Sequence, residues 1–235
     1  MDPNQIWDLE GVFLKGNVLS LIGGFDFRNG VSGYTSGSKD FTSGDIFIST
    51  DAVYGQTAVP TGLSNGQNNV NNAFGYEYAL DIDWSTLVFS VVKLDPTDTT
   101  TTVYYALNQD SMPSSNPWKY VSGGTTVAGG TGTWAGSTGS SNGLMTTAQV
   151  ADAEVLNWGS QAFTNHYAVS FDLSSFFSVA GLNGSDFYTH FTMGCGNDNL
   201  MGQGTAPVPE PATMFLFGTG LAGLAGISRR RKKQA

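Results

Sequence analysis

Residues 76–84 read YEYALDIDW, and the second half of this stretch decides the class of fold. Apolar and acidic residues alternate there, so Leu80, Ile82 and Trp84 point to one face of an extended chain and the two aspartates between them to the other. A period of two residues is typical of a strand that buries one face. The β-branched and aromatic segment 86–92 comes directly afterwards and predicts a neighbouring strand.

Short strands separated by turn residues are predicted along most of the chain. Besides the two above, they cover residues 18–22, 25–27, 45–49, 99–107, 166–171 and 187–193. The segment 122–143 is rich in Gly, Ser and Thr and predicts either a long loop or a pair of weak strands. A helix is expected at 146–157 and one helical turn at 172–177. We therefore predict a mainly β body over residues 1–201, folded as a single β-sandwich or a jelly-roll-like domain.

The charge distribution limits the partners of this body. The formal net charge is −9, although the chain has ten basic residues. Half of these basic residues form one run near the C-terminus: Arg229, Arg230, Arg231, Lys232 and Lys233. The body that precedes this run is therefore strongly acidic and repels nucleic-acid phosphates, so no nucleic-acid partner is expected.

The composition changes after Met201. Residues 202–208 predict a linker, which Pro209, Glu210 and Pro211 follow, and residues 212–227 carry no charge. Sixteen helical residues rise about 24 Å, which is shorter than the hydrocarbon core of about 30 Å, but flanking basic side chains can extend the reach of the helix. A basic run on one side only keeps that side in the cytoplasm. We expect one short C-terminal transmembrane helix at 212–227 and an ectodomain on the outer side.

The tail also resembles a known family. The segment VPEPATM at 208–214, the Gly-rich apolar run and the basic run at 229–233 resemble, in this order and spacing, the PEP-CTERM sorting signal. This resemblance, over residues 209–235, implies recognition by exosortase, a membrane-embedded processing enzyme of Gram-negative bacteria that make extracellular polysaccharide. It also implies that the tail holds the exported protein in the inner membrane. Cleavage near Pro209, Glu210 and Pro211 would then release the body to the cell surface or the extracellular matrix, while the basic run sets the topology.

Part of the body is similar to one set of these proteins as well. The segment HFTMGCGNDNLMG at 190–202 resembles their recurring Cys-Gly-Asn-Asp segment, and a few shorter segments resemble the same set. The resemblance implies no defined activity for the body. Members of the set carry a signal peptide, whereas residues 1–5 have neither a basic start nor an apolar run. We therefore expect the export signal to lie upstream of Met1.

Several side chains are candidates for catalysis. Neighbouring carboxylates occur as three pairs: Asp81 with Asp83, Asp152 with Glu154, and Asp45 with Asp51. A glycosidase needs two carboxyl groups about 5–9 Å apart across a cleft, and proximity in sequence does not establish this. His190 and Cys195 offer a Cys–His arrangement, but no nucleophile signature surrounds the cysteine. The simpler interpretation is that His190 is a structural histidine in a strand, as His166 is, and that Cys195 is a small buried residue in a turn. We therefore expect no catalytic residue.

One calcium site is also a candidate. Its oxygen ligands would come from a turn-rich segment and a nearby aspartate: Asp186, Asn197, Asp198 and Asn199. The spacing is not that of an EF-hand, and such residues in turns more often make local hydrogen bonds. No other cofactor is expected.

Two functional classes follow. The first is a noncatalytic surface or extracellular-matrix protein associated with the polysaccharide of a biofilm. The alternative is a secreted carbohydrate-active enzyme. Exposed aromatic rings on one sheet face favour the first class, because they stack on sugars. The candidates for such rings are Trp84, Trp118, Trp134 and Trp158. A cleft with two facing carboxylates favours the second class.

Overall fold

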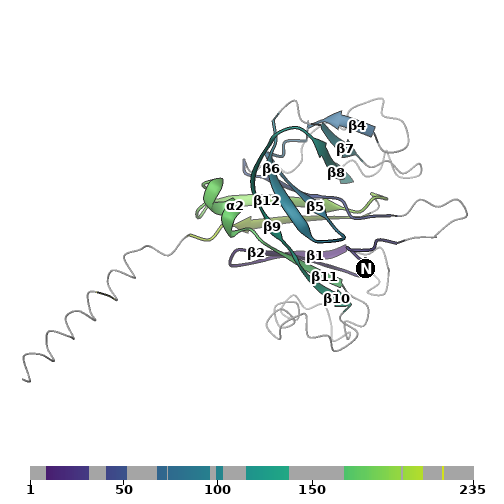
Figure 1. The fold of residues 1–235 in the computed structure, drawn as a ribbon, viewed down its shortest axis with the longest axis horizontal. Coiled ribbons are helices and arrows are strands. Elements are labelled where there is room, and N and C mark those ends of the chain that lie inside the picture. Colours follow the sequence, from purple (N-terminus) through teal and green to yellow (C-terminus); the bar gives the residue numbers. More distant parts are fainter. Residues whose placement is uncertain are drawn as a thin grey trace, which may run out of the picture.

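The structure is a computed structural model that describes residues 9–31, 41–51, 68–72, 74–95, 99–102, 115–137, 167–196, 198–208 and 219. These residues form antiparallel sheets with one short helix (Figure 1). The strands that begin before residue 100 are β1 (Leu9–Lys15), β2 (Val18–Gly23), β3 (Ile46–Ser49), β4 (Asn68–Asn71), β5 (Tyr78–Asp83), β6 (Val88–Lys93) and β7 (Thr99–Thr102). The later elements are β8 (Lys119–Ser122), β9 (Thr125–Thr131), β10 (Thr133–Ser137), β11 (Tyr167–Asp172), α2 (Ser174–Val179), β12 (Asp186–Thr192) and β13 (Asn199–Thr205).

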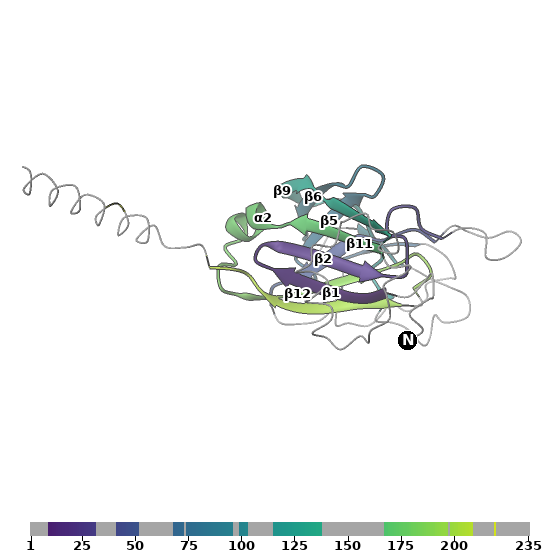
Figure 2. The ribbon, with the colours of Figure 1, turned by 90° about the horizontal axis from the view of Figure 1, so that it is seen from below.

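Two sheets pack face to face as a sandwich, which confirms the predicted mainly β architecture. One sheet has the order β1-β2-β11-β10, and the central sheet has the order β13-β12-β3-β5-β6-β9. Figure 2 shows β1, β2 and β11 side by side on one side of the sandwich. Their facing sides bury a large apolar core that includes Leu21, Phe171, Leu80, Ile82 and Phe89. The alternation in β5 thus has the predicted cause, because its even-numbered residues face this core.

A third sheet, of order β4-β7-β8, lies near the other face of the central sheet and was not predicted (Figure 1). A second apolar cluster, with Phe47, Tyr76 and Ala79, fills this face, and Tyr120 of β8 packs against it. The central strand β3 is therefore covered on both faces. This explains why its residues 46–48 are all apolar instead of alternating.

Glycines occur at the two edges of the sandwich where one sheet comes close to the other. Gly132 lets the chain cross from β9 in the central sheet to β10 in the other sheet, and a Cβ atom there would lie 2.7 Å from the Phe171 ring. Of the two structures predicted for residues 122–143, a long loop or a pair of strands, the described part of the segment therefore has the pair of strands. At the opposite edge of the sandwich, a Cβ atom on Gly202 of β13 would lie 2.3 Å from Val12 of β1. Bare backbone at these points lets the sheets approach closely.

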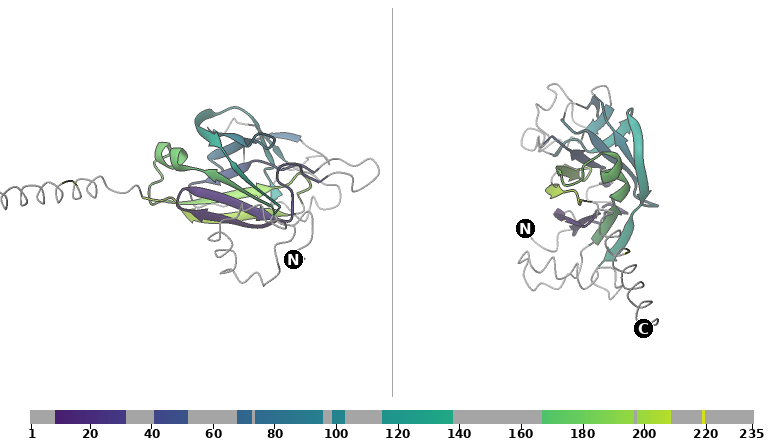
Figure 3. Two further views of the ribbon diagram at one scale, coloured as in Figure 1. Left: turned by 60° about the horizontal axis from the view of Figure 1, so that its bottom comes forward. Right: turned by 90° about the vertical axis from the view of Figure 1, so that its left-hand side faces the viewer.

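Two predicted boundaries are wrong. Residues 25–27 lead into a turn at 27–29 instead of forming a strand, because the Asp26 carboxylate accepts the N–H groups of Arg28 and Asn29. The end of the body predicted at residue 201 is also wrong, because a further strand, β13, pairs with β12 through Thr205. The body therefore extends beyond Met201, and the first part of the linker predicted at 202–208 belongs to a sheet. Ala206, which follows, is also buried, and its backbone bonds to Gly184 and Ser185. Figure 3 shows the short green helix α2 at the end of the body where the chain leaves it.

The predicted sorting tail lies outside the described residues except for Thr219. The helix expected at 146–157 lies outside them as well. Within the described part of the chain, no helix has the length and apolar character needed to cross a membrane.

Candidate functional site

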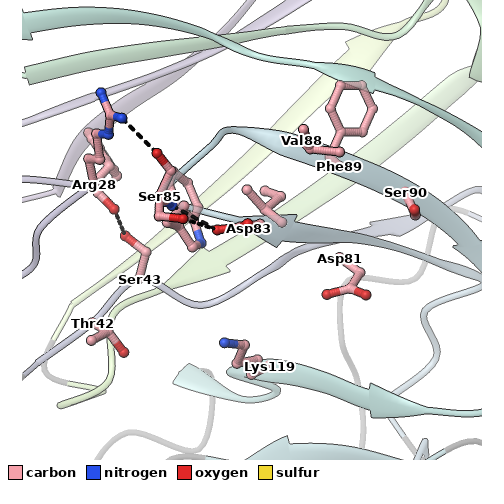
Figure 4. Close-up of a pocket in the computed structure, with 13 residues that line it drawn as sticks. Arg28, Thr42, Ser43, Asp81, Asp83, Ser85, Val88, Phe89, Ser90 and Lys119 are labelled. Atoms are coloured by element: carbon pink, nitrogen blue, oxygen red, sulfur yellow. Dashed lines mark hydrogen bonds between the residues drawn. The ribbon is translucent and has the colours of Figure 1, made fainter.

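A polar groove of about 590 Å³ lies beside the turn that joins β5 to β6. Segments from four parts of the chain line it: residues 27–28, residues 42–43, the β5–β6 hairpin and the first residue of β8. Two cationic and two anionic side chains lie on its wall, namely Arg28, Lys119, Asp81 and Asp83 (Figure 4). Such a volume is typical of a small-molecule site.

Asp81 lies on the face of β5 that points away from the sandwich core. It is opposite Ser90 of β6, which also lines the groove. Partial burial raises the pKa of Asp81 above its ordinary value, and the positive charge of Lys119 opposes this rise. In Figure 4 the Asp81 carboxylate and the Lys119 amine lie on facing strands, on either side of the same open space. The alternation along the strand predicted on which face of β5 Asp81 lies. It did not predict that β8 brings Lys119 close to this face.

Asp83 stabilises the turn between β5 and β6 through hydrogen bonds. Its carboxylate accepts the N–H and hydroxyl of Ser85 and the hydroxyl of Thr86, at 2.6 to 2.9 Å. These hydrogen bonds lower its pKa to about 2, so the group is ionised at neutral pH. Arg28 reinforces the turn, because its Nη2 donates to the Ser85 carbonyl at 2.6 Å. The predicted pair Asp81 and Asp83 thus lines one groove, with one carboxylate occupied by local hydrogen bonds.

Asp45 bonds to both of the strands that carry the groove residues Asp81 and Lys119. Its two carboxylate oxygens accept the backbone N–H groups of Ile82, at 3.0 Å, and Tyr120, at 2.8 Å. Its own N–H donates to the Trp118 carbonyl at 2.9 Å. Complete burial raises the pKa of Asp45 to about 7, although the two N–H donors lower it. Asp45 thereby ties the residues on both sides of Lys119 to the central sheet, Tyr120 through its carboxylate and Trp118 through its backbone N–H. An aspartate directly before an apolar strand was the available sequence signal for this role.

The other predicted carboxylate pairs do not form a site in the described residues. Asp45 and Asp51 flank the two ends of β3, and Asp51 accepts the Ser49 hydroxyl at 2.8 Å. The pair Asp152 and Glu154 lies outside the described residues.

His190 and Cys195 do not form a pair either. His190 is buried against Tyr76, and its Nε2 donates to the Pro117 carbonyl at 3.1 Å. Cys195 belongs to the sandwich core, on the opposite side of the central sheet. His166 lies outside the described residues.

The predicted calcium ligands are separated by the register of the β12–β13 hairpin. Asp186 pairs with Thr205 at one end of the hairpin, and Asn199 pairs with Thr192 at the other. Asp198 accepts the N–H groups of Leu9 and Asn199, while Asn197 lies outside the described residues. The proposed four-residue grouping is therefore wrong. Within the described ranges, no three His, Cys, Asp or Glu side chains gather to hold a metal ion.

The three candidate tryptophans among the described residues do not form an exposed row for stacking on sugars. Trp84 is buried, and its Nε1 donates to the Gly44 carbonyl at 2.8 Å. Trp118 is buried as well, while Trp134 is partly buried and stacks on Tyr167. Trp158 lies outside the described residues.

The comparison with protein families concerns the end of the chain. Residues 207–232 match the model of the PEP-CTERM protein-sorting motif. The chain carries a PEP-CTERM sorting motif. The resemblance noted in the tail is thereby confirmed, and the motif indicates exosortase-dependent sorting of an exported protein to the cell surface. No curated protein and no solved structure matches the chain. The PEP-CTERM motif begins directly after Ala206, so the folded body and the sorting signal adjoin without an intervening domain.

Proposed function

We propose that this PEP-CTERM protein is a noncatalytic component of the cell surface or extracellular matrix that associates with extracellular polysaccharide. Before release, the tail holds it transiently in the inner membrane through a helix at 212–227. The single observation that carries the proposal is the sorting motif at residues 207–232, which directly follows a folded β body. Exosortase is the partner that processes this motif.

The arrangement of the body supports contact with the matrix. The chain leaves the body after Ala206, next to Thr205, which pairs with the first residue of β12. Ser43 of the groove forms a bridge to Met193, just past the last residue of β12. These points are separated by the length of a seven-residue strand, about 20 Å. While the tail is in the membrane, the groove therefore lies at the end of β12 that is farther from it.

A secreted carbohydrate-active enzyme is the second candidate, and one observation favours it. Asp81 and Asp83 line the same groove, and their pKa values shift in opposite directions. Such divergence is typical of an acid and a base in glycoside hydrolysis. We favour the noncatalytic function because hydrogen bonds within the turn already occupy the Asp83 carboxylate.

Processing is tested with the full chain expressed behind a signal peptide in a host that contains exosortase. Intact mass and cell fractionation should show a released body that lacks the basic run. The double variant Glu210→Ala with Pro211→Ala should remain membrane-bound and uncut, whereas Thr205→Ala, outside the motif, should be processed normally. A wild-type protein that keeps its tail through Ala235 would contradict the proposed sorting.

The polysaccharide association is tested by incubating the released protein with the exopolysaccharide of the producing cells. Cosedimentation without a fall in polymer length supports the noncatalytic function. Depolymerisation by wild type, but not by Asp81→Asn, would establish the enzyme instead.

A further inference from the structure

Asp81 and Lys119 are opposite charges that line the same groove but do not bond to one another. Asp81 projects from β5 and Lys119 from β8 (Figure 4). Lys119 is close enough to lower the pKa of Asp81, yet within the described part of the chain no ion pair joins them. An occupant of the intervening space would meet an acceptor on one side and a donor on the other. A hydroxyl group satisfies both, because it donates and accepts.

The charge balance of the groove indicates a neutral occupant. The cations Arg28 and Lys119 match the carboxylates Asp81 and Asp83 in number. An acidic sugar would bring a further carboxylate beside Asp81, on a chain whose formal net charge is already −9. Like charges at such short range disfavour binding.

The site is also held in position before any ligand arrives. Lys119 lies between Trp118 and Tyr120, and backbone hydrogen bonds to Asp45 fasten both neighbours. Asp81 lies within a strand that is paired on both sides, by β3 and β6. Because the backbone that carries both side chains is already fixed, binding a ligand costs less conformational entropy.

We propose that this groove binds a neutral saccharide unit, with adjacent sugar hydroxyls donating to the Asp81 carboxylate and accepting from the Lys119 ammonium group. Ser90, opposite Asp81 on β6, adds a hydroxyl to the same wall. The inference rests on the proposed association with polysaccharide and gives that association a location and a preference.

The test measures binding of the full chain, purified in a detergent without sugar groups, to dextran and galactomannan as neutral probes and to alginate as an acidic one. We expect wild type to bind a neutral probe more tightly than alginate. Asp81→Ala and Lys119→Met should each raise the dissociation constant for that probe about tenfold or more, because each removes a charged hydrogen-bond partner. Lys93→Met, at an exposed site on β6 outside the groove, is the matched control and should bind like wild type.

The outcomes separate this inference from the broader function. If wild type binds a neutral probe and both groove variants bind it equally well, while their thermal unfolding stays cooperative, the assignment of the groove is wrong and the polysaccharide association stands. Preference for alginate would overturn the neutral-sugar assignment. If wild type binds neither these probes nor the polysaccharide of its producer, the proposed association itself fails.

Discussion

The Asp45 carboxylate accepts the backbone N–H of Tyr120 at 2.8 Å, across 75 positions of sequence. Its other oxygen accepts the N–H of Ile82 at 3.0 Å. One buried side chain thereby joins the central sheet to the first strand residues of β8. The stability of this junction and its response to pH follow from the chemistry of that carboxylate.

Replacing Asp45 by Asn should destabilise the protein although the shape is conserved. An amide has one oxygen acceptor, so its nitrogen would face one of the two N–H donors. A buried donor without an acceptor costs about 1–3 kcal/mol, and we expect this loss in the free energy of unfolding from urea titrations. Asp172→Asn is the control, because Asp172 is exposed and its side chain accepts the N–H of Ser174 with a single oxygen. Equal stability of the two variants would contradict the proposed role of Asp45.

The buried residues Asp45 and His190 should have opposing effects on stability between about pH 4 and pH 6.5. Burial raises the pKa of Asp45 from 3.8 to about 7 and lowers that of His190 from 6.5 to about 4. In this range, unfolding releases a proton from Asp45 and adds one to His190. The stability contribution of Asp45 therefore falls as pH rises, whereas that of His190 falls as pH decreases. Together their effects largely cancel.

Single variants should remove this cancellation. Relative to wild type, the unfolding free energy of His190→Gln should fall with rising pH, by up to about 1.4 kcal/mol per pH unit. That of Asp45→Asn should rise with pH by a similar amount. Urea titrations at three pH values between 4 and 6.5 measure both slopes. Variant slopes of the same sign, or unchanged from wild type, would show that these groups do not titrate as the structure indicates.

Gly44→Ala should destabilise the protein more than Gly202→Ala. A Cβ atom on Gly44 would lie 2.2 Å from the carbonyl oxygen of Trp118 and 2.7 Å from that of Thr192, both backbone atoms. A Cβ atom on Gly202 would mainly meet a Val12 methyl group, at 2.3 Å, which a rotamer change can move. Overpacking costs about 1–3 kcal/mol, and we expect Gly44→Ala at or above the top of that range. Thermal unfolding of both variants measures the difference, and the reverse order would refute it.

The basic run at 229–233 should determine which end of the tail stays in the cytoplasm. Changing all five residues to Gln removes the charge that retains this end. A C-terminal epitope should then become accessible to protease added to spheroplasts. Changing Arg229, Arg230 and Arg231 to Lys keeps the charge and should leave the epitope protected. An epitope that stays protected in the Gln variant would assign the topology to another feature.

Local patterns in the sequence predicted the features that depend on neighbouring residues. The alternation of apolar and acidic residues at 80–84 predicted which face of β5 is buried, because side chains in a strand alternate by geometry alone. The sorting motif was evident for a similar reason, since its signal is the order of Pro209, Glu210, Pro211, an apolar run and a basic run. Neither inference requires knowledge of which other segments of the chain lie nearby in the folded protein.

Tertiary structure decided the features that depend on residues far apart in the chain. The third sheet covers the second face of β3, and Asp45 brings Lys119 across the groove from Asp81. The same kind of long-range pairing gives the Trp84 indole N–H its acceptor, the Gly44 carbonyl, and puts Asp186 and Asp198 at opposite ends of one hairpin. Strand register and sheet order specify these distances. Both result from the packing of whole faces against one another, which no local window of sequence contains.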